Sequence, residues 1–237
     1  MTTDPYDVPR GFATLVVVAI VLAIAGCGES QHPAKANPTH GPPPALAAAA
    51  TLVRLDRLQV RPRPRSTWGY VRDAFGSDWM DTDHDGCNQR DDVLLRDAVP
   101  GSTTVGQQGA CDHDVLAGTW HDPYTGRTLT FTDLKDLRQA EAIQIDHVVP
   151  LAEAWVSGAA GWSRARRELF ANDLHELLAV DGPTNMSKGD GDPAAWRPRK
   201  GYQCAYARRW IEVKATWRLA VDPSEKTALE DMLGFCP

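Results

Sequence analysis

Three things are scarce in this 237-residue sequence: positive charge, cysteine and long apolar segments. Lysines and arginines number 25 against 31 aspartates and glutamates, which gives a formal net charge of −6. A chain with this balance lacks the global basic field of a protein that coats nucleic acid without sequence preference. An enzyme that binds a few phosphates locally remains compatible with it.

An unbroken apolar stretch near the N-terminus, residues 12–25, has the length of a signal-peptide h-region and is short for a membrane span. It ends in a small-residue pair directly before Cys27, which resembles the lipobox of bacterial lipoproteins. The resemblance implies a signal peptide over residues 1–26, and a lipid on Cys27 that anchors the protein to the outer face of the cytoplasmic membrane, with secretion as a variant. An uncleaved signal anchor is the alternative, because Asp4 and Asp7 leave the N-terminal region without a clear positive charge.

The few cysteines exclude two kinds of site. No pair has the CxxC spacing of a structural zinc site, and none lies beside a base that would activate a thiol nucleophile. An even number of cysteines in an exported domain predicts two disulfides, with three possible connectivities. Proximity in the sequence favours Cys87 with Cys111 and Cys204 with Cys236.

Composition divides the chain beyond the signal peptide. Residues 27–50 are rich in Pro, Ala and Gly and lack apolar periodicity, which predicts a flexible linker. Residues 51–237 then form one domain. Its most basic segment lies between residues 52 and 72. This segment either binds phosphates or forms a solvated arm that packs on the domain through the aliphatic parts of its arginine side chains.

The domain shows neither an internal repeat nor the βαβ alternation that a parallel sheet requires. Strand-like residues on both sides of the turn at 122–126 predict a β-hairpin between 115 and 131. Apolar residues at helical spacing predict helices over 202–219 and 224–233. The expected fold class is therefore α+β.

An acidic segment between Asp81 and Asp92 has the spacing of an EF-hand calcium loop, with Gly86 at the sharp turn. The last ligand position holds Asp instead of Glu, and Cys87 is expected in a disulfide. A hydrogen-bonded acidic turn is the favoured interpretation, and calcium binding is the alternative.

The segment from 142 to 196 carries the chemistry. An apolar strand ends in Asp146 and His147, and a second strand at 177–180 leads through a turn into a helix that holds Asn185 and Lys188. Folding the second strand onto the first brings these four side chains together. A carboxylate and a carboxamide oxygen suit Mg²⁺ or Mn²⁺, and a neutral imidazole can take a proton from water.

This pattern, Asp-His-Val-Val-Pro at 146–150 and Asn-x-x-Lys-Gly-Asp at 185–190, resembles the HNH endonuclease motif. The same form occurs in the cutting domain of RNA-guided nucleases and in the C-terminal domain of GmrSD-type restriction enzymes. The wider context resembles a family of exported bacterial HNH proteins, from about Tyr70 to Cys236. It implies a ββα-metal core (142–196) with an added β-hairpin and C-terminal helices.

The resemblance also implies roles for individual residues. His147 would be the general base, Asp146 and Asn185 the ligands of one divalent metal, and Lys188 a phosphate or structural contact. Many HNH domains have a second Asn nine positions before the distal one, and it orients the histidine. Glu176 occupies that position here, so the orienting role would pass to Asn172.

The sequence supports two hypotheses about function, one an enzyme and the other a binding module. The leading hypothesis is a metal-dependent endonuclease acting on DNA or RNA outside the cytoplasmic membrane, with nucleic acid and the membrane as partners and no protein partner. The alternative is an inactive HNH-like surface lipoprotein that serves as a binding module. Glu153, on the helix expected after Pro150, is either an acid close to the site or a solvent-facing carboxylate.

Overall fold

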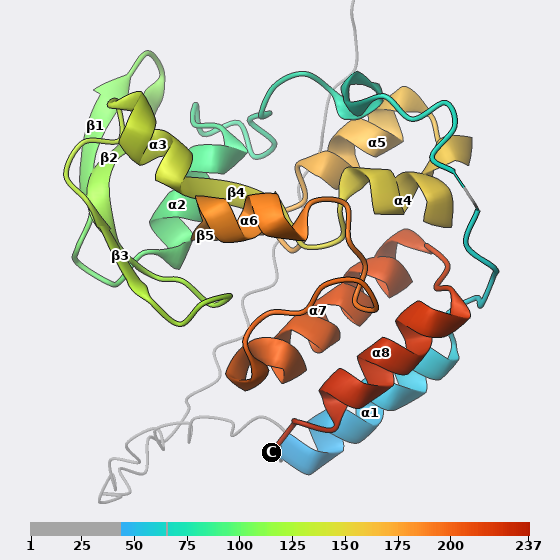
Figure 1. Cartoon of the computed structure of the whole chain (residues 1–237). Coiled ribbons are helices and arrows are strands. Elements are labelled where there is room, and N and C mark those ends of the chain that lie inside the picture. The colour runs from blue at the N-terminus through green and yellow to red at the C-terminus, as the bar shows by residue number, and fades with distance from the viewer. Residues whose placement is uncertain (1–43, 65) are drawn as a thin grey trace, which may run out of the picture. The chain divides into compact units, whose positions relative to one another are not determined.

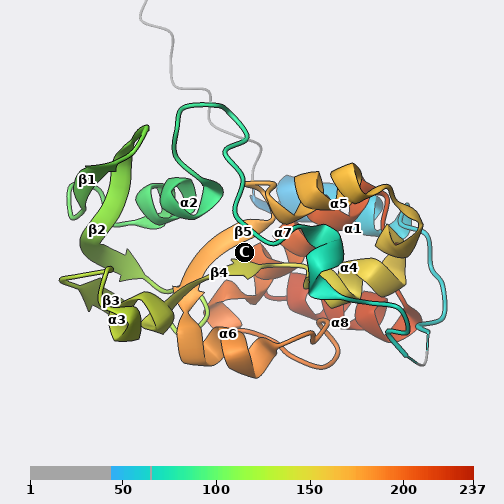
Figure 2. The ribbon, with the colours of Figure 1, turned by 90° about the horizontal axis from the view of Figure 1, so that it is seen from above.

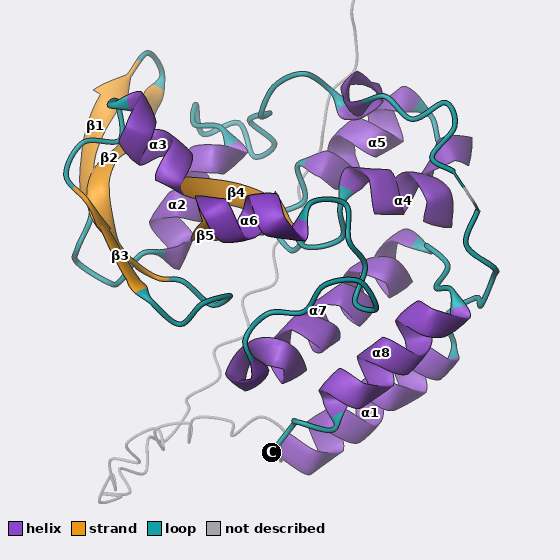
Figure 3. Ribbon diagram, viewed as in Figure 1, coloured by secondary structure: helices purple, strands orange, loops and turns teal. Residues whose placement is uncertain are grey.

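The computed structural model describes residues 44–64 and 66–237, so the predicted signal peptide and Cys27 lie outside the described residues. The architecture is α+β, as predicted, and it combines small antiparallel sheets with several helices (Figures 1 and 3). The helices are α1 (Pro44–Asp56), α2 (Gln89–Asp97), α3 (Leu137–Ala142), α4 (Leu151–Ser157), α5 (Arg164–Ala171), α6 (Gly182–Lys188), α7 (Lys200–Trp217) and α8 (Pro223–Leu233), with short 3-10 turns η1 (Arg72–Phe75) and η2 (Ala159–Gly161). The strands are β1 (Thr104–Gln108), β2 (Cys111–His121), β3 (Thr128–Phe131), β4 (Ile143–His147) and β5 (Leu177–Asp181).

The predicted β-hairpin is formed by β2 and β3, which pair antiparallel. Asp122 shapes the turn between them, because its carboxylate accepts a hydrogen bond from the backbone nitrogen of Thr125 at 2.7 Å. Strand β1 extends this hairpin to three strands in the order β1-β2-β3. It was not predicted, since its residues are mostly exposed and polar and carry little alternation.

Strands β4 and β5 form a separate antiparallel pair, and α6 follows β5 directly. Asp181 starts α6 by accepting a hydrogen bond from the backbone nitrogen of Thr184 at 3.0 Å. The two faces of β5 enter different cores: Leu177 packs with α2 and β2, and Leu178 packs with the helical side. The pair therefore lies between the three-stranded sheet and the helices (Figure 2).

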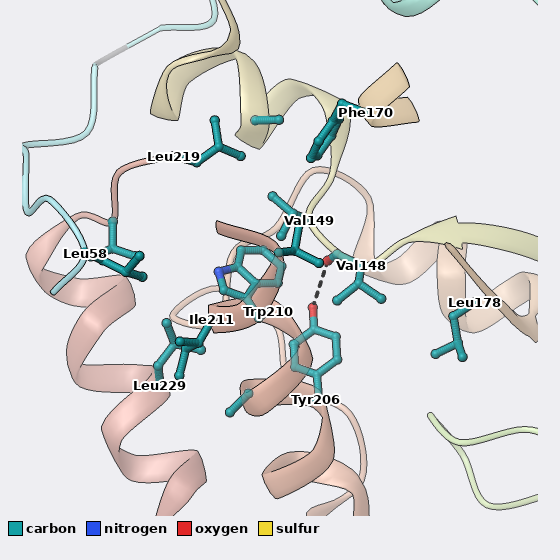
Figure 4. Close-up of a cluster of buried hydrophobic side chains, with 14 of the residues drawn as sticks. Leu58, Val148, Val149, Phe170, Leu178, Tyr206, Trp210, Ile211, Leu219 and Leu229 are labelled. Atoms are coloured by element: carbon teal, nitrogen blue, oxygen red, sulfur yellow. Dashed lines mark hydrogen bonds between the residues drawn. The ribbon is translucent and has the colours of Figure 1, made fainter. Parts of the chain in front are cut away.

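The larger core is built by helices α1, α4, α5, α7 and α8 around the chain that leaves β4. Trp210 and Ile211 of α7 face Leu229 of α8, and the Tyr206 hydroxyl lies 3.5 Å from the carbonyl oxygen of Val148 (Figure 4). Helix α8 begins with a capping box between Asp222 and Glu225.

Both C-terminal helices lie within two residues of their predicted bounds. Helix α1 differs from expectation, because it begins at Pro44 and so includes the last residues, 44–50, of the predicted linker. Its continuation towards Asp56 carries Leu55, which is fully buried in the helical core. Packing of Leu55 against the core stabilises the helix through residues 44–50, and the composition of those residues does not indicate this.

Two disulfides join the cysteine pairs that are close in sequence. Cys87 bonds to Cys111, with Cα atoms 4.3 Å apart, and Cys204 bonds to Cys236, with Cα atoms 5.0 Å apart. The first links the start of α2 to β2. The second links α7 to the segment after α8.

Removing the Cys204–Cys236 bond should lower the free energy of unfolding by about 3 kcal/mol, because the bond closes a loop of 32 residues and restricts the unfolded chain. Denaturant unfolding of the Cys204→Ser/Cys236→Ser variant measures the loss. The oxidised parent is the reference, and the Cys87–Cys111 bond stays intact in both proteins. An unchanged unfolding midpoint would contradict the prediction.

Candidate active site

His147 is the last residue of β4, and it is held on two sides. Its Nε2 atom lies 2.8 Å from the carbonyl oxygen of Ala171, which can only accept, so we place the proton on Nε2. The ring of Trp79 stacks on the imidazole, with centroids 5.6 Å apart and planes 13° apart. Burial lowers the pKa of His147 to about 3. The imidazole is therefore neutral, with the lone pair of Nδ1 left as its acceptor.

Asp146 precedes His147 on β4, and Lys188 and Tyr124 fix its carboxylate. Oδ1 accepts a hydrogen bond from Nζ of Lys188 at 2.9 Å, and Oδ2 accepts one from the Tyr124 hydroxyl. The Lys188 side chain is fully buried, and its Nζ also donates to the backbone oxygen of His147 at 2.8 Å. Burial raises the pKa of Asp146, and Lys188 and Tyr124 oppose that rise. These hydrogen bonds are structural contacts, one of the two roles predicted for Lys188, and phosphate contact stays a prediction.

Asn185 reaches the same region from α6. Its Nδ2 donates to Oε1 of Gln144 at 3.0 Å, which orients the carboxamide. Asp146, His147 and Asn185 all line one cleft of about 430 Å³. The structure therefore brings together the residues that the motif predicted to be close.

The oxygen donors in this cleft suit a hard divalent cation. The Asp146 carboxylate has about four acceptor sites and uses two of them in hydrogen bonds. Within the described residues, the Asn185 carboxamide oxygen accepts no hydrogen bond. A cation would share Asp146 with the Lys188 ammonium, and the cleft has room for water and phosphate beside it.

Asn172 makes no hydrogen bond to His147. Its Oδ1 accepts from the backbone nitrogen of Met80 at 2.8 Å, and its Nδ2 donates to the backbone oxygen of Glu168 at 2.9 Å. Met80 follows Trp79, so Asn172 is connected to the imidazole only through the segment that carries the stacked indole. The direct contact to His147 comes from the neighbouring Ala171 carbonyl.

Glu176 is completely buried beneath the end of β4. Its Oε1 accepts a hydrogen bond from the backbone nitrogen of Val149, and its backbone oxygen accepts one from the nitrogen of Val148, both at 2.9 Å. Burial raises the pKa of Glu176 well above its ordinary value, which favours the neutral acid. Glu176 thus holds the chain that leaves His147 and does not touch the imidazole by any hydrogen bond.

Several cleft residues were outside the predicted site. Trp79 and Arg90 line the cleft, and Tyr124 lies behind it as the partner of Asp146; all three come from segments distant in sequence and have no spacing relation to the motif. Arg72 belongs to the basic segment for which phosphate contact was one of two interpretations, and it also lines the cleft. Only its positive charge could have indicated this in advance.

The acidic segment begins with a hydrogen-bonded turn, the favoured interpretation, and ends with Asp92 inside α2. The Asp81 carboxylate accepts from the backbone nitrogens of His84 at 2.7 Å and Gly86 at 3.0 Å. Oxygens of the aspartates at 81, 83 and 85 lie within 4.8 Å of one another. The turn precedes α2 and lies outside the lining of the cleft.

Comparisons with known proteins agree with the motif. A family model described as "GmrSD restriction endonucleases, C-terminal domain" matches residues 89–232. The chain is 41% identical, over 202 residues, to a protein of the fungus Arthroderma benhamiae named "Uncharacterized secreted protein"; the match covers 84% of this chain and 91% of that protein. No solved structure matches.

Two expectations about origin and anchoring find no support in these comparisons. The relative is fungal, although a bacterial family was expected, and its name mentions secretion but no lipid. Cys27, the expected lipidation site, lies outside the described residues. Among residues 44–64 and 66–237, no helix has both the length and the apolar character needed to cross a bilayer.

Proposed function

Since the chain belongs to the family of GmrSD restriction endonuclease C-terminal domains, we propose that it is a metal-dependent endonuclease that hydrolyses phosphodiester bonds of DNA or RNA. One observation carries the proposal. A neutral histidine, fixed through Nε2 and with Nδ1 as its free acceptor, lines a cleft that a carboxylate and a carboxamide also line. This arrangement fits water activation beside a cation site.

In the proposed reaction, Nδ1 of His147 takes a proton from a water molecule while the water oxygen bonds to phosphorus. The bond from phosphorus to the leaving oxygen breaks, and that oxygen takes a proton from solvent. The Ala171 carbonyl and the Trp79 ring keep the imidazole in place throughout. Asn172 acts indirectly, by holding the backbone of Met80 next to Trp79.

Asp146 and Asn185 would hold the divalent ion, for which we propose Mg²⁺ or Mn²⁺. When bound, such an ion offsets the negative charge that develops on the phosphate and on the leaving oxygen. Lys188 keeps the Asp146 carboxylate fixed and balances its charge, so the ligand stays ionised in a buried position.

We propose that the enzyme acts outside the cell. The secreted relative and the two disulfides support this place of action. Anchoring through a lipid on Cys27 remains a prediction, and mass spectrometry of the protein isolated from its own membranes would test it.

The proposed activity is tested with the full chain, its disulfides formed, and supercoiled plasmid. Nicked and linear products should appear with Mg²⁺ or Mn²⁺ and disappear with EDTA. Single-stranded RNA in parallel reactions separates the two nucleic acids. Intact plasmid and RNA with every metal, from protein shown to be folded, would overturn the proposal and favour the binding-module alternative.

Replacing Asn185 with alanine should raise the metal concentration that gives half-maximal cleavage by about tenfold or more, because a ligand oxygen is lost. Ser187→Ala is the matched control, since Ser187 is an exposed neighbour on α6 that does not line the cleft. Metal titrations of both variants measure the effect. Equal metal requirements in the two variants would remove Asn185 from the ligand set.

A further inference from the structure

Two arginines line the cleft together with His147: Arg72 from η1 and Arg90 from the first turn of α2. Within the described part of the chain, neither forms an ion pair with a carboxylate. This sets them apart from arginines such as Arg63, Arg96 and Arg127, each of which pairs with an acid. Their positive charges are therefore available to an anion that enters the cleft.

Arg90 is only partly exposed, and burial lowers its pKa. Its hydrogen bond to the carbonyl oxygen of Ala140 is long, at 3.5 Å. The charge of the neighbouring Asp91 opposes this fall in pKa, although the two side chains form no ion pair. A guanidinium withdrawn from water without a paired carboxylate is costly, and an anion beside it would offset that cost. The place of Arg90 in the lining of the cleft therefore favours binding of an anion there.

Arg72 is exposed and lies where two hollows meet. It lines the cleft of about 430 Å³ and a second hollow of about 140 Å³, and His147 and Trp79 line both as well. Because the same three residues line both hollows, the guanidinium of Arg72 shares its surroundings with the imidazole. A phosphate bound by Arg72 would therefore lie close to the proposed base.

We propose that Arg72 and Arg90 bind the phosphodiester backbone of the substrate, each through one phosphate. The inference rests on the proposed nuclease function and names how that site holds its strand. A guanidinium presents a planar fork of donors that matches two phosphate oxygens. Two local contacts of this kind also explain how a chain of net charge −6 holds a polyanion without a global basic field.

The test measures binding without cleavage. A fluorescently labelled single-stranded DNA oligonucleotide is titrated with the full chain in EDTA, at several salt concentrations, with anisotropy as the readout. Arg72→Gln and Arg90→Gln should each weaken binding about tenfold and reduce the slope of log affinity against log salt by about 0.7, the value for one phosphate contact on a single strand.

Arg208→Gln is the matched control. Arg208 is an exposed arginine of α7, also without an ion pair among the described residues, and it lines a different hollow beside His175. It should leave affinity and salt slope unchanged. If Arg208→Gln weakens binding and the two cleft variants do not, nucleic acid binds on that other surface and the proposal is overturned.

Further arms separate folding and catalysis from binding. Arg90→Lys keeps the positive charge but loses the planar fork of donors. Its salt slope should therefore equal that of the parent, while its affinity should lie between those of the parent and Arg90→Gln. If Arg90→Gln unfolds at a lower temperature, the exposed Arg72 decides the outcome. Metal-dependent cleavage with unchanged salt slopes would overturn only the arginine assignment. Reduced salt slopes in the two cleft variants, without cleavage by the parent, would support the arginine assignment and overturn the nuclease function.

Discussion

Replacing His147 with alanine is expected to lower the rate of plasmid cleavage by about 10²- to 10⁴-fold, the usual contribution of a general base. The imidazole has one acceptor atom, Nδ1, because Nε2 is committed to the Ala171 carbonyl. Among the described residues that line the cleft, His147 is the one histidine. Initial rates at saturating Mg²⁺ measure the loss.

The control is His175→Ala, which removes an exposed histidine that does not line the cleft and should leave the rate unchanged. His147 is buried, so its removal could also disturb the packing of Trp79. Added imidazole separates the two causes: it should restore part of the rate if a base is missing, and none if the fold is damaged. Cleavage by His147→Ala at the parent rate would show that His147 is not the base.

The ββα core could be predicted from the sequence because its signals are local. Strand β4 is an apolar run that ends at a polar pair and a proline, and β5 is followed at once by Asp181, which caps α6. The antiparallel pairing of the two strands then places Asp146 and Asn185 at the same cleft. Local pattern and one pairing were sufficient for this part of the site.

The surroundings of His147 could not be predicted because tertiary packing supplies them. The group that fixes Nε2 is a backbone carbonyl, that of Ala171, and any residue type at this position presents the same atom. Trp79 reaches the imidazole because Asn172 holds the backbone of Met80. The sequence singled out Asn172 as the orienting residue, whereas the contact to His147 comes from its neighbour.

Glu153 also shows where the pattern was insufficient, because neither of the two roles considered for it is correct. It is buried in α4, where its Oε1 accepts from Nζ of Lys214 at 2.8 Å and its Oε2 pairs with Arg63. Lys214 is fully buried in α7 and also pairs with Glu225 of α8 at 2.6 Å. One ammonium thus joins three helices, and no periodicity in the sequence identifies such a residue.

Replacing Lys214 with methionine is expected to lower the free energy of unfolding by about 3–5 kcal/mol at pH 8, because Glu153 and Glu225 would face each other in the core without their common cation. Denaturant unfolding, followed by tryptophan fluorescence, measures the loss. The matched control is Lys226→Met on α8, since the ion pair of Lys226 with Asp56 lies at the surface and should contribute less than about 1 kcal/mol.

The loss should depend on pH with a defined sign. Burial raises the pKa of Glu225 from 4.5 to about 7, with Glu153 adding to the rise and Lys214 opposing it. A carboxyl group whose pKa is higher in the folded state binds its proton more tightly there, so its contribution is complete below pH 4.5 and is lost as the pH rises through about 7. Without Lys214 the rise has no opposing charge, so the variant should recover much of its stability at pH 5.

A second substitution identifies the cause of the loss. Adding Glu225→Gln to Lys214→Met removes the ionisable partner, and it should restore stability at pH 8 while flattening the difference between pH 5 and pH 8. A cavity left by the lysine stem would give the opposite pattern, a loss that is equal at both pH values and is unaffected by Glu225→Gln. That result would show that Lys214 contributes by packing and that its charge is not what holds the three helices together.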